Sequence, residues 1–197
     1  FEDFTTTSKP EKANGYRQAW AKQSYFTQWR YNYDNRYFGE VSLRRDGRSN
    51  FGSNNRYGNF FSFSGAWNMN NESWFKAQWV DMLKLRASFG SVGNVPTSLY
   101  PSYSLYSVGA SYNEQSGALI SQIGNKDLTW EKTFTTGVGV DAAFFQNRLT
   151  ATLDFYVKNT SNILYQVPVT GLVGVTSIWK NIGKMRNTGV ELTIGGD

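Results

Sequence analysis

Several residue types and segments are missing from this 197-residue chain, and each absence narrows what the chain can do. Cysteine and histidine are both absent. This excludes a disulfide scaffold, a metal site ligated by either residue and a histidine-based catalytic triad within the chain. No run of about 18 apolar residues occurs, so no segment reads as a transmembrane helix. No signal peptide is recognisable, and the chain starts at Phe1 and stops just after an expected strand. We therefore expect an internal segment of a longer protein.

The composition is rich in aromatic residues and only moderately hydrophobic. Aromatic residues make up 17% of the chain and all hydrophobic residues 40%. Few aliphatic and many aromatic side chains suit a one-sided sheet with aromatic girdles, although an aromatic-rich extracellular sandwich fits the same composition. The net charge of +5 comes from basic residues scattered singly or in pairs. We therefore expect no nucleic-acid partner, and an anionic lipid headgroup or a solvated face explains the charge better.

Alternation of apolar and polar residues predicts a β-hairpin at 128–158, turning at Gln146 and Asn147. One face of its first arm carries Trp130, Phe134, Val138, Val140, Ala142 and Phe144, and the opposite face is polar. Both arms reach the length of about 9–11 residues that a tilted transmembrane strand needs. Similar alternation predicts further strands at 25–33, 37–44, 60–69, 83–90 and 190–194. The chain is therefore expected to be all-β, with about seven antiparallel up-and-down strands.

The lengths of the connections favour a barrel over a sandwich. In chain order they are short (34–35), long (46–56), intermediate (70–81), long (91–127), short (146–147) and long (160–181). Alternate connections of an up-and-down sheet lie at the same end, and outer-membrane barrels have short turns at one end and long loops at the other. Residues 1–14 are expected to form a loop, and 72–80 could hold a short helix because its aromatic residues cluster on one side.

Charged residues fall on the polar faces of the predicted strands, where a wet lumen would cost them little desolvation. The solvent-facing side of an ordinary sandwich predicts the same alternation. The candidate lumen-facing residues are Arg30, Glu40, Arg44, Lys84, Arg86, Glu131, Asp141, Asp154 and Lys158. Aromatic residues near the short turns are instead candidates for a membrane girdle, namely Tyr33, Tyr37, Trp67 and Phe144.

Four segments resemble the barrel domain of the SusC/RagA family of TonB-dependent outer-membrane transporters. They are LRRDGRSNFG at 43–52, LKLRASFG at 83–90 with Gly93 and Asn94, NKDLTWEKT at 125–133, and NIGKMRNTGVE at 181–191. Their order and spacing fit the family over most of the chain after Tyr25. Lys126 is a small departure, since the family usually has proline there.

The resemblance implies a 22-stranded barrel in the outer membrane of a Gram-negative bacterium, of which residues 1–197 would form a part. A plug domain and the remaining strands would lie outside this sequence. The resemblance also implies active uptake of oligosaccharide or peptide cargo, with a SusD-like surface lipoprotein as a lid and TonB acting through the plug. A passive porin or secretion channel and a soluble carbohydrate-binding sandwich are the alternatives.

No catalytic constellation stands out, so we expect neither an enzyme nor a cofactor. The loop at 91–127 holds tyrosines among serine and glycine, and a tyrosine ring can pack against its own loop, a partner protein or a sugar. The candidate contacts to cargo or lid are Tyr100, Tyr103, Tyr106 and Tyr112.

Overall fold

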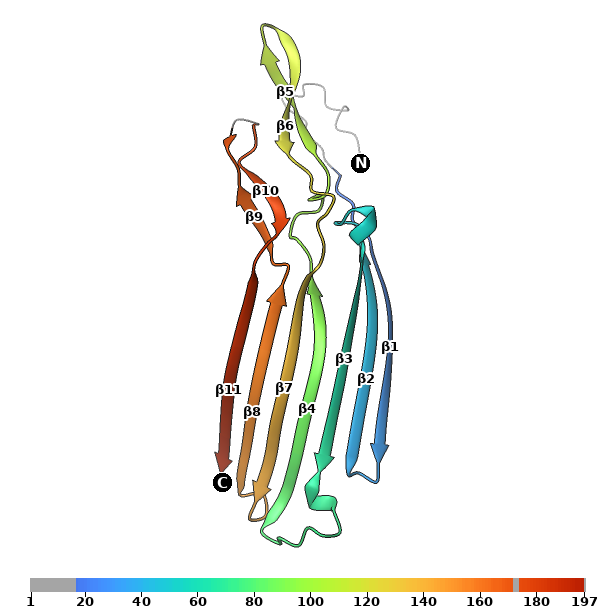
Figure 1. Cartoon of the computed structure of the whole chain (residues 1–197), viewed down its shortest axis with the longest axis vertical. Coiled ribbons are helices and arrows are strands. Elements are labelled where there is room, and N and C mark those ends of the chain that lie inside the picture. The colour runs from blue at the N-terminus through green and yellow to red at the C-terminus, as the bar shows by residue number, and fades with distance from the viewer. Residues whose placement is uncertain (1–16, 172–173, 197) are drawn as a thin grey trace, which may run out of the picture.

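Seven long antiparallel strands lie side by side in a single curved sheet (Figure 1). The computed structural model describes residues 17–171 and 174–196. Neighbouring strands follow one another in the sheet order β1-β2-β3-β4-β7-β8-β11. Their bounds are Lys22–Tyr33 (β1), Tyr37–Arg48 (β2), Tyr57–Asn68 (β3), Val80–Asn94 (β4), Glu131–Phe144 (β7), Leu149–Ser161 (β8) and Lys184–Gly196 (β11).

The two ends of the sheet carry different connections. One end, here called the loop end, bears two small hairpins and the 3₁₀ turn η1 (Figure 1). The opposite end, here called the short-turn end, bears the β1–β2 and β7–β8 turns and the connector at 69–79, which opens with the 3₁₀ turn η2. The bounds of these smaller elements are Ser53–Asn55 (η1), Met69–Asn71 (η2), Leu105–Tyr112 (β5), Gln115–Gln122 (β6), Leu164–Pro168 (β9) and Ser177–Asn181 (β10).

Local backbone geometry explains the tight turns at the short-turn end. Asp34 and Asn35 have φ values of 51° and 52°, and Arg36 N donates to Tyr33 O at 2.9 Å. Asp and Asn tolerate the left-handed region, and two such residues in a row give the turn whose twist matches a hairpin. The β7–β8 turn places Phe145, together with Gln146 and Asn147, in the same region.

The sheet is open, and its two faces differ in chemistry. The edge strand β1 is exposed along its whole length, and β11 along nearly all of its length. Side chains on the apolar face stay exposed as well, with Phe63 at 46%, Val138 at 53% and Leu192 at 63%. A sandwich would bury that face against a second sheet. The predicted all-β, antiparallel part of a larger barrel is confirmed, and the described strands do not close a barrel by themselves.

A small dry core lies at the loop end. Phe51 and Leu128 are fully buried, and Phe60 and Trp130 are nearly so. Trp130 meets Phe51 at a ring-centroid distance of 5.0 Å and Phe60 at 5.4 Å. Phe60 belongs to the polar face of β3, so the prediction that Trp130 shares the apolar face with Phe134 is wrong. Residue 130 precedes the first ladder pair of β7. Strand alternation therefore does not fix the direction of its ring, which packs into the core at the loop end.

The expected helix at 72–80 is also wrong. The described helical turn of this connector is η2, which ends at Asn71. After it the chain makes isolated turns, such as the bond from Phe75 N to Glu72 O at 3.1 Å. Two of the aromatic residues that suggested an amphipathic helix, Trp74 and Trp79, pack instead against rings of the strands.

Three loops are more ordered than the sequence suggests. β2 continues to Arg48, because Asp46 and Gly47 have ladder partners on both sides. The predicted loop at 91–127 holds the end of β4 and the β5–β6 hairpin, which turns at Asn113 and Glu114 with positive φ. The predicted connection at 160–181 holds β9 paired with β10. The predicted loop at 1–14 lies outside the described residues.

Candidate functional site

The strand register gathers the predicted lumen-facing residues on the polar face of the sheet. Arg30 pairs with Glu40, Lys84 with Asp141, and Arg86 with Gly139, which pairs in turn with Asp154. Successive residues of a strand point to opposite faces, so the other members of the set, Arg44, Glu131 and Lys158, share this face through the same register. The structure therefore brings all of them to one side, and their exposure to a lumen stays a prediction.

A charge network occupies the middle of this polar face. Arg86 donates from Nε and Nη2 to the carboxylate of Asp141 at 2.7 and 2.9 Å, and from Nη2 to Asp154 at 3.1 Å. Thr152 donates to Asp141 as well, at 3.2 Å. A side chain at Gly139 would collide with Asp154 and with the Arg86 guanidinium. The glycine therefore provides the space in which one arginine joins carboxylates from two strands.

Other charges predicted to face a lumen also have partners. Arg30 Nε lies 2.9 Å from Glu40, whose other oxygen accepts from Gln28 at 2.6 Å. The ammonium of Lys158 lies 5.0 Å from the centre of the Tyr156 ring, and that of Lys84 lies 5.7 Å from the ring of Phe38. Pairs this exposed contribute little to stability, so they serve mainly to keep the face polar and hydrated.

Glu131 differs from the other candidate lumen-facing residues because its carboxylate connects two strands at the loop end. One carboxylate oxygen accepts from the backbone nitrogen of Leu164 at 3.1 Å, and the other accepts from the Asn94 amide at 3.4 Å. These bonds fasten the start of β9 to the end of β4. Periodicity alone could place Glu131 on the polar face but could not identify a partner 33 residues away.

A recess of about 460 Å³ opens on the polar face at the loop end. Arg44 lines it and is held by Asp46 at 2.8 Å. Phe60 and Trp130 contribute aromatic surface, and Lys22 and Arg48 contribute further positive charge, so the recess combines cations with rings.

The loop tyrosines have different environments. The Tyr100 hydroxyl donates to Ala19 O and accepts from Ala19 N, both at 3.0 Å, which ties the loop to the segment before β1. Tyr103 and Tyr106 expose 52% and 62% of their surface. The side chain of Tyr112 lies outside the described residues. Tyr100 thus ties its loop to a neighbouring segment, and contact of the loop tyrosines with cargo or lid stays a prediction.

The candidate girdle residues stack in rows at the short-turn end. Tyr33, Tyr37 and Trp67 form one row, with centroid distances of 6.4 and 6.2 Å. Phe144 forms a second row with Trp79, which lies 5.6 Å away and is nearly parallel. Aromatic rings with polar edges suit a membrane–water boundary, and their contact with lipid stays a prediction.

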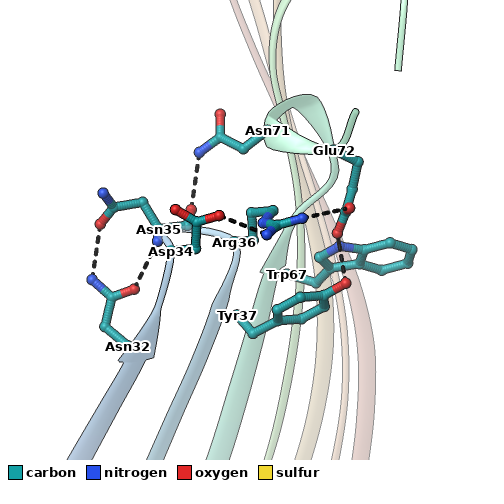
Figure 2. Close-up of polar contacts among 8 residues, drawn as sticks. All are labelled: Asn32, Asp34, Asn35, Arg36, Tyr37, Trp67, Asn71 and Glu72. Carbon is teal, nitrogen blue, oxygen red and sulfur yellow. Dashed lines mark hydrogen bonds and ion pairs between the residues drawn. The ribbon is translucent and has the colours of Figure 1, made fainter. Parts of the chain in front are cut away.

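A buried carboxylate sits beside the first row. Figure 2 shows Glu72 accepting from the Tyr37 hydroxyl at 2.6 Å and from the Trp67 indole at 2.9 Å, with Arg36 3.4 Å away. The hydrogen bond from Tyr37, then that from Trp67, and the nearby Arg36 charge hold the pKa of Glu72 below its ordinary value.

The turn beside this cluster is tied to the connector. Asn71 donates to Asn35 O at 2.9 Å, and Asp34 pairs with Arg36 at 2.6 Å (Figure 2). Sequence analysis missed Glu72 because its partners Tyr37 and Trp67 become neighbours only when β2 and β3 pair. The aromatic residues clustered after it are the available signal in the sequence, and their spacing predicts a helix instead.

Neither a metal centre nor a membrane-spanning helix is present in the described part of the chain. No group of three or more Asp and Glu residues there could hold a metal ion. None of the described helical segments is long and apolar enough to cross a membrane.

Comparisons with known proteins assign the family. The family model described as TonB dependent receptor-like, beta-barrel, matches residues 2–197. The chain belongs to this TonB-dependent receptor family. It is 38% identical over 175 residues to the TonB-dependent receptor P39 of Formosa agariphila, and 31% identical over 183 residues to the TonB-dependent receptor SusC of Bacteroides thetaiotaomicron. These alignments cover 88% and 87% of this chain and 17% and 18% of those relatives.

Solved structures agree with this assignment. The RagAB peptide transporter superposes with a TM-score of 0.84 at 37% identity, over 90% of this chain and 20% of that one. The siderophore receptor PirA of Pseudomonas aeruginosa matches with a TM-score of 0.59 at 18% identity, over 88% of this chain and 30% of that one, and supports the fold alone. The resemblance to the SusC/RagA family is confirmed, and so is the assignment to part of a TonB-dependent receptor barrel.

Proposed function

We propose that residues 1–197 form part of the barrel wall of a TonB-dependent transporter that takes up oligosaccharides or peptides across the outer membrane of a Gram-negative bacterium. The observation that carries this proposal is the two-faced sheet. Its apolar side chains remain exposed, whereas Arg86 joins the carboxylates of Asp141 and Asp154 on the opposite face. Hydrocarbon on one side and a hydrated lumen on the other satisfy both faces at once.

The proposal includes components outside this chain. The sequence spans less than a fifth of the curated relatives it matches, and the exposed edges of β1 and β11 need further strands. We expect a plug domain through which TonB acts, and a SusD-like surface lipoprotein over the loop end. Peptide is one cargo class to test because RagAB is a peptide importer. Oligosaccharide is the other, and we assign no catalytic activity.

Uptake with and without TonB tests the proposal. Cells carrying the full-length protein are given fluorescent peptides or oligosaccharides, and accumulation is measured in the presence and absence of functional TonB. Active transport predicts loss of accumulation without TonB, and loss of the lipoprotein gene should lower it as well. Accumulation that persists without TonB would favour the passive porin.

Membrane residence is measured separately. The full-length protein should require detergent and should migrate differently in gel electrophoresis before and after heating. Heat-insensitive migration and solubility without detergent would count against a barrel.

A further inference from the structure

We infer that the connector at 70–79 is a lipid anchor, in which Trp74 and Trp79 insert into the headgroup boundary of the bilayer and Glu72 fixes the connector in place. This anchor is distinct from the candidate girdle residues, which belong to strands, because Trp74 and Trp79 belong to the mostly polar connector between β3 and β4. It rests on the outer-membrane placement proposed above.

The first observation is the exposure of both indoles. Trp74 and Trp79 each leave 56% of their surface uncovered, in a segment otherwise composed mostly of small and polar residues. A large exposed apolar ring is unfavourable in water, at about 25 cal/mol for each Å². Two such rings on one short connector indicate a surface that meets something apolar.

The second observation is where the rings lie. Trp74 packs edge-on against Trp67 at 6.3 Å, and Trp79 stacks on Phe144 at 5.6 Å. The register places Trp67 and Phe144 on the apolar face of β3 and β7. The two indoles therefore continue the apolar face beyond the ends of the strands, and the medium that covers that face should cover them.

The third observation concerns charge. The connector holds two charged residues, Glu72 and Lys76. The Glu72 carboxylate is turned inward, with 7% of its side chain exposed, and is satisfied by Tyr37 and Trp67 (Figure 2). Lys76 is exposed and suits lipid phosphates. A buried, hydrogen-bonded Glu72 carboxylate and an exposed Lys76 ammonium are the arrangement expected beside an anionic headgroup layer.

Glu72 acts as a positioning residue in this arrangement. It is bonded to Tyr37 of β2, to Trp67 of β3 and to Arg36 of the first turn. These contacts precede Trp74 by two residues and set the direction in which the connector leaves the sheet. Removing the carboxylate would leave the two ring donors unpaired and release the connector.

Spin-label depth measurements test the inference in the full-length protein. In a cysteine-free background reconstituted into phospholipid vesicles, single nitroxide labels are placed by Trp74→Cys, Trp79→Cys and Ser73→Cys. Val138→Cys marks the middle of the apolar face, and accessibility to oxygen is compared with accessibility to a water-soluble nickel chelate. We expect the oxygen-to-nickel ratio at 74 and 79 to exceed that at 73 several-fold.

The label at 138 separates two kinds of failure. If 138 lies in lipid while 74 and 79 are as accessible to nickel as 73, the anchor is overturned and the membrane placement stands. If 138 itself is in water, the placement proposed for the whole sheet is overturned.

A second pair of variants tests the role of Glu72. With the label at 74, Glu72→Ala should lower the oxygen-to-nickel ratio towards that of an aqueous site, whereas Ser73→Ala should leave it unchanged. Heat-dependent gel migration verifies that both variants retain the barrel. An unchanged ratio in Glu72→Ala would overturn the positioning role.

Discussion

The two ends of the sheet use aromatic residues in opposite ways. At the loop end, Phe51 and Trp130 are at 0% and 3% exposure inside a dry core. At the short-turn end, Trp74 and Trp79 are each 56% exposed; Trp74 meets Trp67 edge-on and Trp79 stacks on Phe144. The buried rings stabilise the loop end by leaving water, whereas exposed rings at a bilayer boundary would be covered by lipid. The contrast is expected if the short-turn end lies at a bilayer boundary, as proposed above.

The ends also differ in what fixes them. The loop end relies on packing, supplemented by backbone bonds such as those of Glu131. The short-turn end relies on the Glu72 hydrogen bonds and on short turns of positive φ. Packing defects should therefore matter most at the loop end, whereas loss of the Glu72 hydrogen bonds should matter most at the short-turn end.

The largest expected effect comes from Trp130→Ala. Truncating a buried aromatic residue costs about 3–5 kcal/mol, and the Trp130 indole nitrogen finds no hydrogen-bond partner among the described residues, so the loss is one of packing. Hydrogen exchange of the full-length protein in detergent should show faster opening around 49–56 and 93–95. Trp74→Ala is the matched control, since that ring is exposed. Equal effects of the two variants on the loop end would contradict the comparison.

A smaller effect is expected from Gly93→Ala. A methyl group there would collide with the Phe60 ring and come within 2.9 Å of Trp130 Cε3. Overpacking of this kind costs about 1–3 kcal/mol, and exchange at the loop end should rise accordingly. Gly39→Ala is the control, because a methyl group at that position meets nothing within 4 Å. Equal exchange rates at the loop end in Gly93→Ala and Gly39→Ala would contradict a tightly packed core.

The smallest effect concerns pH at the short-turn end. Because the folded-state pKa of Glu72 is lowered, its contribution is fully present above the unfolded pKa and is lost as pH falls through the folded value. Exchange at 69–80, corrected for intrinsic rates, should therefore increase on acidification.

Two variants isolate the titrating group in this pH experiment. Glu72→Gln should remove the pH dependence. Asp34 also faces Arg36, so Asp34→Asn serves as the second control and should retain the dependence. A pH response that disappears in Asp34→Asn instead would assign it to the turn.

Much of the fold could be predicted because strand alternation and turn residues are local signals. Asp34 and Asn35 marked a turn, and the period of two placed Arg86, Asp141 and Asp154 on one face before any register was known. The β5–β6 hairpin escaped prediction because Glu114, which is not a typical turn residue, adopts positive φ beside Asn113.

The sequence by itself determined the strands, their two faces and the parity of long and short connections, since each depends on neighbours within a few residues. The tertiary structure decided which aromatic rings are buried away from water. The Trp130 ring packs against Phe60, and Glu72 accepts a hydrogen bond from Tyr37, 35 residues away in the sequence. Contacts of this kind form only when distant strands come into register, because burial depends on what lies opposite a side chain as well as on its place in the chain.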